Sequence, residues 1–163
     1  MKTIYLVRHA KSSWQIPGLK DHERPLLEVG VERTGKITNY LIANGAKIDL
    51  IIASHAVRSW ETALLIAQAL GYPVKEIKEE RKIYLGTDES LLDIVSGLPD
   101  DLESVMLVGH NPVISGFAQM LKARLDSDMP TSAVVCIGCE TTKWNQVIMA
   151  KKEVKFYVYP KML

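Results

Sequence analysis

The sequence has no long hydrophobic run, almost no net charge and few cysteines. No apolar stretch approaches the roughly 20 residues that a membrane-spanning helix needs, so we expect no membrane partner. The formal net charge is +1, from 20 Lys and Arg against 19 Asp and Glu. This balance indicates neither a nucleic-acid-binding stripe nor an acidic tail, so any affinity for an anion must come from a local cluster.

The apolar run near the N-terminus is also short. It follows Lys2-Thr3 and is broken by Arg8-His9, which makes it too short for the hydrophobic region of a signal peptide. We therefore expect a cytoplasmic protein. The length of 163 residues predicts one domain, spanning 1–163, and is sufficient for a core with three layers.

The two cysteines, Cys136 and Cys139, form a CxxC pair in a segment typical of a strand. Residues three apart on a strand point to opposite faces of the sheet. No second cysteine pair or nearby histidine completes a zinc set. We expect two buried structural thiols, no metal centre and no cofactor, with a redox role as the less favoured alternative.

The rest of the chain alternates between strand-like and helix-like segments, around a polar loop at 11–25. Strands are predicted at 3–7, 49–53, 73–78 (a charged edge), 105–108, 132–140 and 153–159. Helices are predicted at 26–44, 57–70, 88–96 and 111 to about 123, the last with Asn111 as N-cap and Pro112 in the first turn. The order predicts a three-layer α/β/α sandwich, with a mostly parallel central sheet and an antiparallel C-terminal addition.

Three of the buried strands end in polar residues of one chemical kind. The first ends in Arg8-His9, the second leads through Ser54-His55 to Arg58, and the third ends in Gly109-His110. Because the carboxyl ends of parallel strands meet at one edge of a sheet, we expect these side chains to converge. An imidazole can act as a nucleophile, and a guanidinium is the preferred fork for a phosphate. Each residue alone has a structural explanation, and it is their convergence that predicts a phosphoryl pocket.

These residues also carry a family resemblance. Arg8-His9, Ser54-x-x-x-Arg58-x-x-x-Thr62-Ala63 and Gly109-His110-Asn111-Pro112 resemble the three signatures of the histidine phosphatase (phosphoglycerate mutase-like) superfamily. The chain length, the segment 8–14 and Asp21-x-x-Arg24-Pro25-Leu26 resemble the small SixA-like phosphohistidine phosphatases. One position departs from the superfamily pattern, since Ala10 replaces the usual glycine. Alanine is still small, so we expect little consequence.

The resemblance implies a role for each matching residue. His9 would be the nucleophile that takes the phosphoryl group, while Arg8, Arg58 and His110 would hold that group and stabilise its charge. Water would then hydrolyse the phosphohistidine. His9 must be neutral for this, and the like charges of Arg8 and Arg58 favour the neutral imidazole. Arg24 matches an arginine of the SixA-like motif, and it would either reach the phosphate or pair with a loop carboxylate.

The general acid is the least determined role. Larger members of the superfamily use a Glu after the third strand, and Glu80 or its neighbour Glu79 is the nearest match here. Asp21 is an alternative from the loop, and all three carboxylates also fit a simply solvated position. Because imidazole departs more easily than an alkoxide, a phosphohistidine substrate would make less use of an acid. His55 is expected to be structural or to lie at the pocket rim.

Only about 35 residues separate the second long helix from the strand before His110, which leaves no room for a large lid. An open pocket suits a phosphate presented on a protein surface. The sequence therefore predicts a metal-independent phosphatase whose partner is a phosphohistidine protein. The alternatives are a phosphatase of small phosphorylated metabolites, a mutase, or a non-catalytic phosphate-binding relative. No nucleic-acid partner is indicated.

Overall fold

The computed structural model describes residues 1–14 and 16–163, and these form one mixed sheet in the order β3-β2-β4-β1-β5-β6. The strands are β1 (Lys2–Arg8), β2 (Leu50–Ala53), β3 (Lys78–Glu79), β4 (Ser104–Gly109), β5 (Val134–Cys139) and β6 (Lys152–Val158). The first four strands are parallel, whereas β5 is antiparallel to both β1 and β6. The predicted parallel sheet with an antiparallel C-terminal addition is confirmed.

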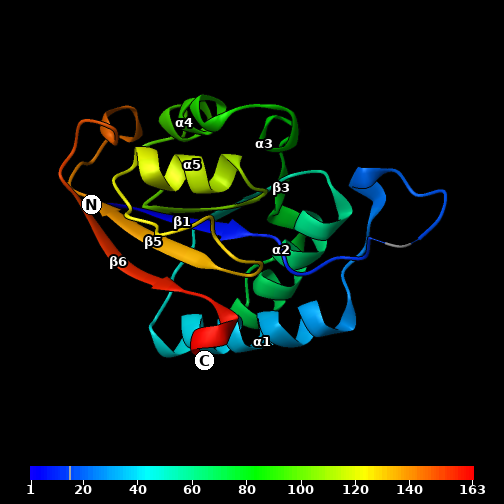
Figure 1. Cartoon of the computed structure of the whole chain (residues 1–163). Helices are drawn as coiled ribbons and strands as arrows, with labels where there is room; N and C mark the ends of the chain where they lie inside the picture. Colours follow the sequence, from blue (N-terminus) through cyan, green and yellow to red (C-terminus); the bar gives the residue numbers. More distant parts are fainter. Residues whose placement is uncertain (15) are drawn as a thin grey trace.

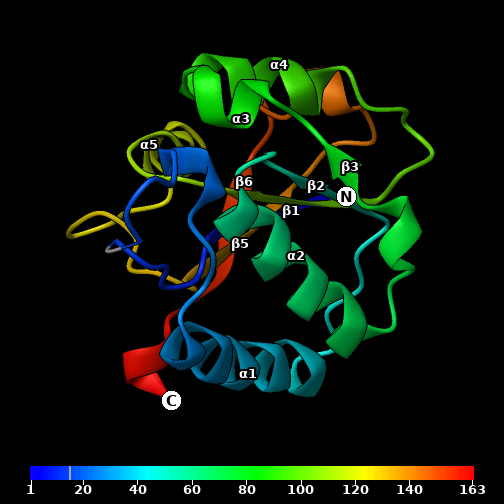
Figure 2. The ribbon, with the colours of Figure 1, turned by 90° about the vertical axis from the view of Figure 1, so that its right-hand side faces the viewer.

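Helices cover both faces of this sheet (Figures 1 and 2). They are α1 (Glu28–Ala43), α2 (Val57–Leu70), α3 (Lys82–Leu85), α4 (Asp88–Ser96) and α5 (Val113–Met120). Side chains alternate along β1, so that Leu6 packs with Phe117 of α5 on one face and Val7 packs with Ile37 of α1 on the other. The two apolar clusters confirm the three-layer α/β/α sandwich.

The central strands are apolar along their whole length because both of their faces are covered. All six residues of β4 are buried, and so are Ile4, Leu6 and Val7 of β1. These two strands pair in parallel from Thr3 with Ser104 to Arg8 with Gly109. The register brings their carboxyl ends to the same level of the sheet.

The segment predicted as an edge strand at 73–78 is mostly not a strand. Residues Val74–Glu76 form a turn of 3-10 helix, and only Lys78–Glu79 pair with β2. Ile77 is the one buried side chain here, which is too little apolar surface to anchor a longer strand. The remaining strand does lie at the edge of the sheet, as predicted.

The predicted N-cap of the last helix is also wrong. The helix begins at Val113, and Pro112 occupies the capping position without a side-chain hydrogen bond. The Asn111 amide instead donates from Nδ2 to the Met129 carbonyl at 2.8 Å, and its oxygen accepts from the Ser115 hydroxyl at 2.5 Å. The side chain therefore ties the strand end to the 129–131 segment instead of capping the helix.

Both cysteines are buried free thiols on opposite faces of the sheet, as predicted. Cys136 packs in the cluster beneath α1 and α2, and Cys139 in the cluster beneath α4 and α5. Burial raises the pKa of each thiol to about 11. Within 1–14 and 16–163, none of the helices has the length and apolar character needed to cross a bilayer.

Candidate active site

The four residues predicted to form the phosphoryl pocket, Arg8, His9, Arg58 and His110, line one cavity of about 390 Å³. Arg24, whose position the sequence left open, lines it too. The cavity lies at the carboxyl ends of β1, β4 and β2, which are adjacent because β4 pairs with both of the others. The sequence predicted that three strand ends meet at one edge of the sheet, and the structure places them there.

His9 is buried, and its hydrogen bonds define which ring nitrogen carries the proton. Nδ1 lies 2.7 Å from the Ala10 carbonyl oxygen. A carbonyl can only accept, so Nδ1 is the protonated nitrogen and Nε2 bears the lone pair. Nε2 accepts from Arg58 Nε at 3.3 Å. Burial, together with the charges of Arg58 and Arg8, lowers the pKa of His9 to about 4, so the ring is neutral at pH 7.

The spacing Arg58-x-x-x-Thr62 connects α2 to the segment that follows His9. Residues four apart lie on one face of a helix. The Thr62 hydroxyl donates to the Arg58 carbonyl at 2.7 Å and accepts from the Ala10 N–H at 2.9 Å. Ala10 is fully buried, which is the physical reason for a small residue after His9. The contacts hold the backbone of the His9 segment against the first turns of α2.

Arg58 is oriented by Asp21 of the 11–25 loop. Its Nη1 donates to the Asp21 carbonyl at 2.7 Å and its Nη2 donates to the Asp21 carboxylate at 3.0 Å. The hydroxyl of Tyr84 donates to the same carboxylate, and Arg24 Nε donates to the other oxygen at 3.2 Å. The hydrogen bond from Tyr84 and the contacts with Arg58 lower the pKa of Asp21 to about 2. Asp21 is therefore a carboxylate that holds two arginines.

The sequence left open whether Arg24 faces the phosphate pocket or pairs with a loop carboxylate, and the structure shows both contacts. Arg24 lines the cavity and it pairs with Asp21. Its guanidinium also lies 3.7 Å from the centre of the Trp14 ring, and its Nη1 donates to the Ser13 carbonyl at 3.1 Å. The stacking and the two hydrogen bonds order a loop arginine beside His9. Contact with a bound phosphate stays a prediction.

Among the residues that the structure describes, Arg8 and His110 each keep one buried polar atom without a hydrogen-bond partner. Arg8 Nη1 donates to the Met129 carbonyl at 3.0 Å, while its buried Nε bonds to nothing among the described residues. His110 Nε2 lies 2.8 Å from the Ser54 hydroxyl and 3.2 Å from that of Ser59. Its Nδ1 is buried, and the described residues offer it no partner either. Buried polar groups are normally satisfied, so these atoms are suited to a bound ligand.

His110 is also neutral. Burial and the charge of Arg58 lower its pKa to about 3, and its ring centre lies 5.3 Å from that of His9. The Ser54 hydroxyl accepts from the Ala56 N–H at 3.1 Å. This arrangement favours a hydrogen bond in which the Ser54 hydroxyl donates to Nε2. The ring proton then lies on Nδ1, and this N–H can donate a hydrogen bond to an anion.

The structure does not bring Glu80 into this cavity. Glu80 follows β3, and its carboxylate lies 3.5 Å from the backbone N–H of Lys82 at the start of α3. Glu79 is exposed, and neither residue is among those that line the cavity. Asp21 is the acidic residue that lines it. The general-acid role of Glu80 stays a prediction, without support from its position.

Sequence reasoning missed several residues of the site. Tyr84 comes from the single-turn helix α3, for which the sequence has no periodic signal. Lys11 and Trp14 belong to the 8–14 segment that carries the resemblance, so their position was a signal for a role. Arg33 of α1 also lines the cavity, although its place on a helix resembles that of any solvated arginine. His55, expected at the rim, packs with its ring between those of His22 and Tyr84.

No group of three or more His, Cys, Asp or Glu side chains in the described part of the chain is arranged to hold a metal ion. The cavity is instead lined by five cationic side chains: Arg8, Lys11, Arg24, Arg33 and Arg58. Guanidinium groups bind phosphate oxygens in pairs. A neutral imidazole surrounded by arginines at the carboxyl edge of an α/β sheet defines a pocket for phosphoryl chemistry.

Comparison with protein families agrees with this arrangement. The family model described as histidine phosphatase superfamily (branch 1) matches residues 4–122. The chain belongs to the histidine phosphatase superfamily. Membership supports a phosphatase, that is, a hydrolase acting on a phosphorylated substrate.

Curated relatives include two proteins without a described activity. An uncharacterised protein of Mycobacterium tuberculosis is 26% identical over 141 residues, which cover 80% of this chain and 85% of that protein. An uncharacterised chloroplastic protein of Arabidopsis thaliana is 32% identical over 128 residues, covering 74% of this chain and 59% of that protein.

Solved structures are similar over almost the whole chain. A candidate phosphohistidine phosphatase SixA of Agrobacterium tumefaciens is 26% identical, with a TM-score of 0.84 and 98% of both chains covered. The protein histidine phosphatase SixA complexed with tungstate is 16% identical, with a TM-score of 0.82 and 98% of both chains covered. The mycobacterial glucosyl-3-phosphoglycerate phosphatase is 13% identical, with a TM-score of 0.66 and coverage of 95% of this chain and 97% of that one.

The family model and these structures confirm the predicted SixA-like histidine phosphatase. Because a protein phosphatase and a metabolite phosphatase share this fold, the fold alone does not select the substrate.

Proposed function

We propose that the protein is a metal-independent phosphatase that removes the phosphoryl group from phosphohistidine in proteins, through a phosphoryl group carried transiently on His9. The observation that carries the proposal is the state of the His9 ring. Its Nδ1 is committed to the Ala10 carbonyl, and the lone pair of Nε2 lies beside Arg58 in the cavity. A neutral, oriented imidazole is the form that can attack phosphorus.

In the first step, Nε2 of His9 forms a bond to phosphorus as the bond from phosphorus to the substrate nitrogen breaks. The substrate imidazole leaves as a neutral ring when its other nitrogen carries a proton. Arg8 and Arg58 offset the negative charge on the phosphoryl oxygens during the transfer, and the Nδ1–H of neutral His110 donates a hydrogen bond to one of them. The arginines supply positive charge that a metal ion supplies in other phosphatases.

In the second step, water attacks phosphorus and the bond to Nε2 breaks. The proton on Nδ1 stays with the ring through its hydrogen bond to the Ala10 carbonyl. His9 therefore leaves as neutral imidazole, which needs no further proton. Orthophosphate is released, and the remaining proton of the water passes to phosphate or solvent.

Two features support a phosphohistidine substrate over an alkyl phosphate. Asp21 is a carboxylate with a pKa of about 2 and donates no proton at neutral pH, and Glu80 is not among the residues that line the cavity. An imidazole leaving group needs no such donor, whereas an alkoxide does. The segment between α2 and β4 contains only short elements, so the cavity stays accessible to a phosphate on a protein surface.

Free thiols at Cys136 and Cys139 accord with a cytoplasmic location.

The test compares wild type with His9→Ala, both in the presence of a chelator, on a histidine-phosphorylated phosphotransfer domain and on sugar phosphates. We expect wild type to prefer the domain in kcat/KM, to resist the chelator, to be inhibited by tungstate and to yield an acid-labile phosphoryl-enzyme. Full activity of His9→Ala would overturn the covalent mechanism. A higher kcat/KM on sugar phosphates would favour a metabolite phosphatase instead.

A further inference from the structure

A second cavity, of about 440 Å³, adjoins the active site. Arg33 of α1 and Thr131 line both cavities, so the two are contiguous. The second cavity continues between α1 and the C-terminal segment, where Lys36, Tyr159, Lys161 and Leu163 line it. The second cavity therefore extends the phosphoryl pocket toward the C-terminal segment.

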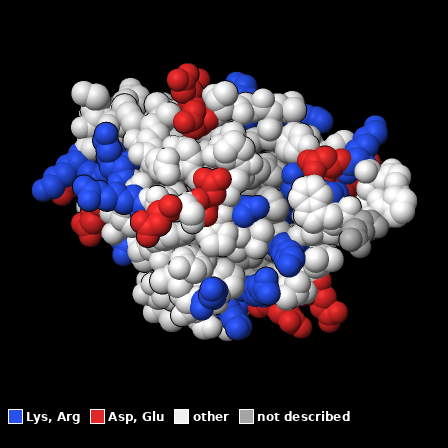
Figure 3. Space-filling view, in the orientation of Figure 1, with Lys and Arg blue, Asp and Glu red and all other residues white. Residues whose placement is uncertain are grey.

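The charged side chains that line this second cavity are all cationic. Arg33 and Lys36 lie three residues apart on α1 and therefore share a face of the helix. Lys161 faces the same cavity from the C-terminal turn. None of the residues that line it is an Asp or Glu, and within the described residues none of the three cations is in an ion pair. Figure 3 shows several Lys and Arg side chains over the lower part of the molecule, where α1 and the C-terminal segment lie, with Asp and Glu side chains beside them at the lower right.

These cations exceed what one phosphoryl group requires. The phosphoryl pocket already holds Arg8, Arg24 and Arg58 close to His9. A cation cluster beyond that pocket, in a concave surface, concentrates a second negative group of the same substrate. The second cavity is therefore suited to the part of the substrate next to the phosphoryl group.

We propose that this second cavity docks an acidic segment of the substrate protein, with Lys36 and Lys161 contacting Asp or Glu side chains near the phosphohistidine. The inference rests on the proposed function and adds a recognition surface to it. Tyr159, Pro160 and Leu163 form an apolar wall, which accommodates the aliphatic and backbone parts of a peptide. A small sugar phosphate offers nothing apolar to that wall.

Lys36 and Lys161 are exposed, which determines the kind of effect they have. Exposed charges act on association more than on the bound state, and salt screens them over a Debye length of about 10 Å at 0.1 M. Docking through these lysines therefore increases kcat/KM on a protein substrate at low salt. The chemistry at His9 does not depend on them.

The test is the double variant Lys36→Glu/Lys161→Glu, assayed on a phosphorylated domain with acidic side chains flanking its phosphohistidine and on free phosphohistidine. We expect kcat/KM on the domain to fall about tenfold at low salt, and kcat/KM on free phosphohistidine to change less than about twofold. Neutralising the acidic side chains of the domain should abolish the difference between wild type and variant, and so should high salt.

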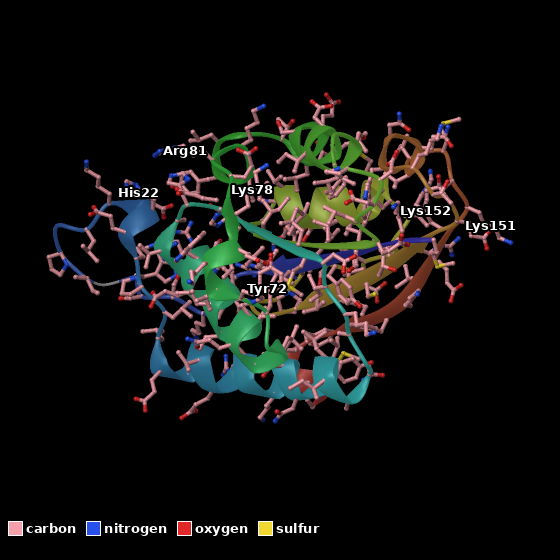
Figure 4. All side chains as sticks on the ribbon, turned by 180° about the vertical axis from the view of Figure 1, so that it is seen from behind. His22, Tyr72, Lys78, Arg81, Lys151 and Lys152 are labelled. Carbon is pink, nitrogen blue, oxygen red and sulfur yellow. The ribbon has the colours of Figure 1, made fainter. Side chains whose placement is uncertain are left out.

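The matched control is the double variant Lys143→Glu/Lys151→Glu, which reverses two exposed lysines outside both cavities and so changes the net charge equally. Lys151 is exposed and lies at the end of the molecule opposite the loop that carries His22 (Figure 4). We expect this charge reversal to leave both rates unchanged, which separates docking from a general effect of net charge.

An unchanged rate on the domain, or an equal loss on both substrates, would overturn the docking site. A small bisphosphorylated compound serves as a third substrate, and a loss confined to it would assign the cavity to a second phosphate instead. If wild type hydrolyses sugar phosphates but not the phosphorylated domain, the proposed function itself fails, an outcome visible before any variant is made.

Discussion

Arg58 donates from Nε to the Nε2 atom of His9 at 3.3 Å, and its two other nitrogens are held by Asp21. A cation that donates to the lone pair of a nucleophile suppresses protonation of that nitrogen and marks the side from which phosphorus approaches. In the proposed mechanism, the phosphoryl group would take the position at Nε2 that the Arg58 N–H occupies in the structure. The guanidinium is then placed to bind the oxygens of that group.

Replacing Arg58 should therefore lower kcat by more than the loss of one positive charge would explain. We expect Arg58→Ala to lower kcat about 100- to 1,000-fold, and Arg58→Lys to recover only a minor part, because an ammonium lacks the planar fork that binds Asp21. Steady-state kinetics on a phosphohistidine substrate measures both. A lysine variant as active as wild type would show that charge alone is sufficient.

Asp21 is expected to position arginines and not to transfer a proton. Asp21→Asn should lower kcat by about tenfold, because a displaced supporting group misplaces the side chains that bind the substrate. The loss should be the same for p-nitrophenyl phosphate and for an alkyl phosphate, since no proton is given to the leaving group. A general acid would instead show a much greater loss on the alkyl phosphate. Tyr84→Phe, which removes one hydrogen bond to the carboxylate, is the milder control.

Both site histidines should stay neutral well below pH 6.5. Their pKa values are lowered to about 4 for His9 and about 3 for His110, chiefly by burial. Nitrogen chemical shifts should show an unprotonated Nε2 on His9 at pH 5.5, with a proton on Nδ1. A ring of His9 or His110 that titrates near pH 6.5 would contradict this arrangement.

The same shifts predict how stability depends on pH. A histidine in the unfolded chain has a pKa of about 6.5, so it binds a proton below that pH while the buried ring of the folded protein stays unprotonated. Stability is thus fully present above pH 6.5 and declines as the pH falls toward 4. Urea unfolding at pH 7.5 and pH 5 should show the decline, and it should be smaller in His110→Asn, which removes one of the two groups.

Two glycines of α1 offer a matched test of packing. A Cβ at Gly30 would lie 2.4 Å from the Lys11 carbonyl oxygen, whereas a Cβ at Gly35 meets nothing within 4 Å. We expect Gly30→Ala to destabilise the fold by about 1–3 kcal/mol and to impair activity, because the backbone after His9 must shift. Gly35→Ala should stabilise by about 0.5–1 kcal/mol through helix propensity. Equal changes in the free energy of unfolding for the two variants would show that α1 is not closely packed against the Lys11 backbone.

The cysteines should be inert in the folded protein. Cys136 and Cys139 are buried on opposite faces of the sheet, and burial raises both pKa values to about 11. A thiol reagent at pH 8 should label neither until denaturant is added. Labelling of the native protein, or a disulfide between the two cysteines, would contradict this prediction and favour a redox role for the CxxC pair.

Local sequence signals were sufficient for most of the fold and for the centre of the site. The apolar runs at 3–7, 49–53 and 105–108 identified the buried parallel strands, since only strands covered on both faces lack alternation. Those signals failed at 73–78 and at Asn111. In the first case a charged segment retained only two paired residues, and in the second the Asn111 amide bonded to Met129 and Ser115, which are distant in sequence.

By itself, the sequence determined which chemical groups stand at the strand ends, because the apolar runs mark where each buried strand stops. The order of the strands in the sheet came from the tertiary structure. Only the tertiary structure decided that Asp21 and Tyr84 meet at Arg58, and that Arg33 joins a second cavity to the first. These contacts join a loop, a single-turn helix and the solvent face of α1. No local periodicity encodes them, and the lowered pKa of His9 depends on burial that exists only once they are packed together.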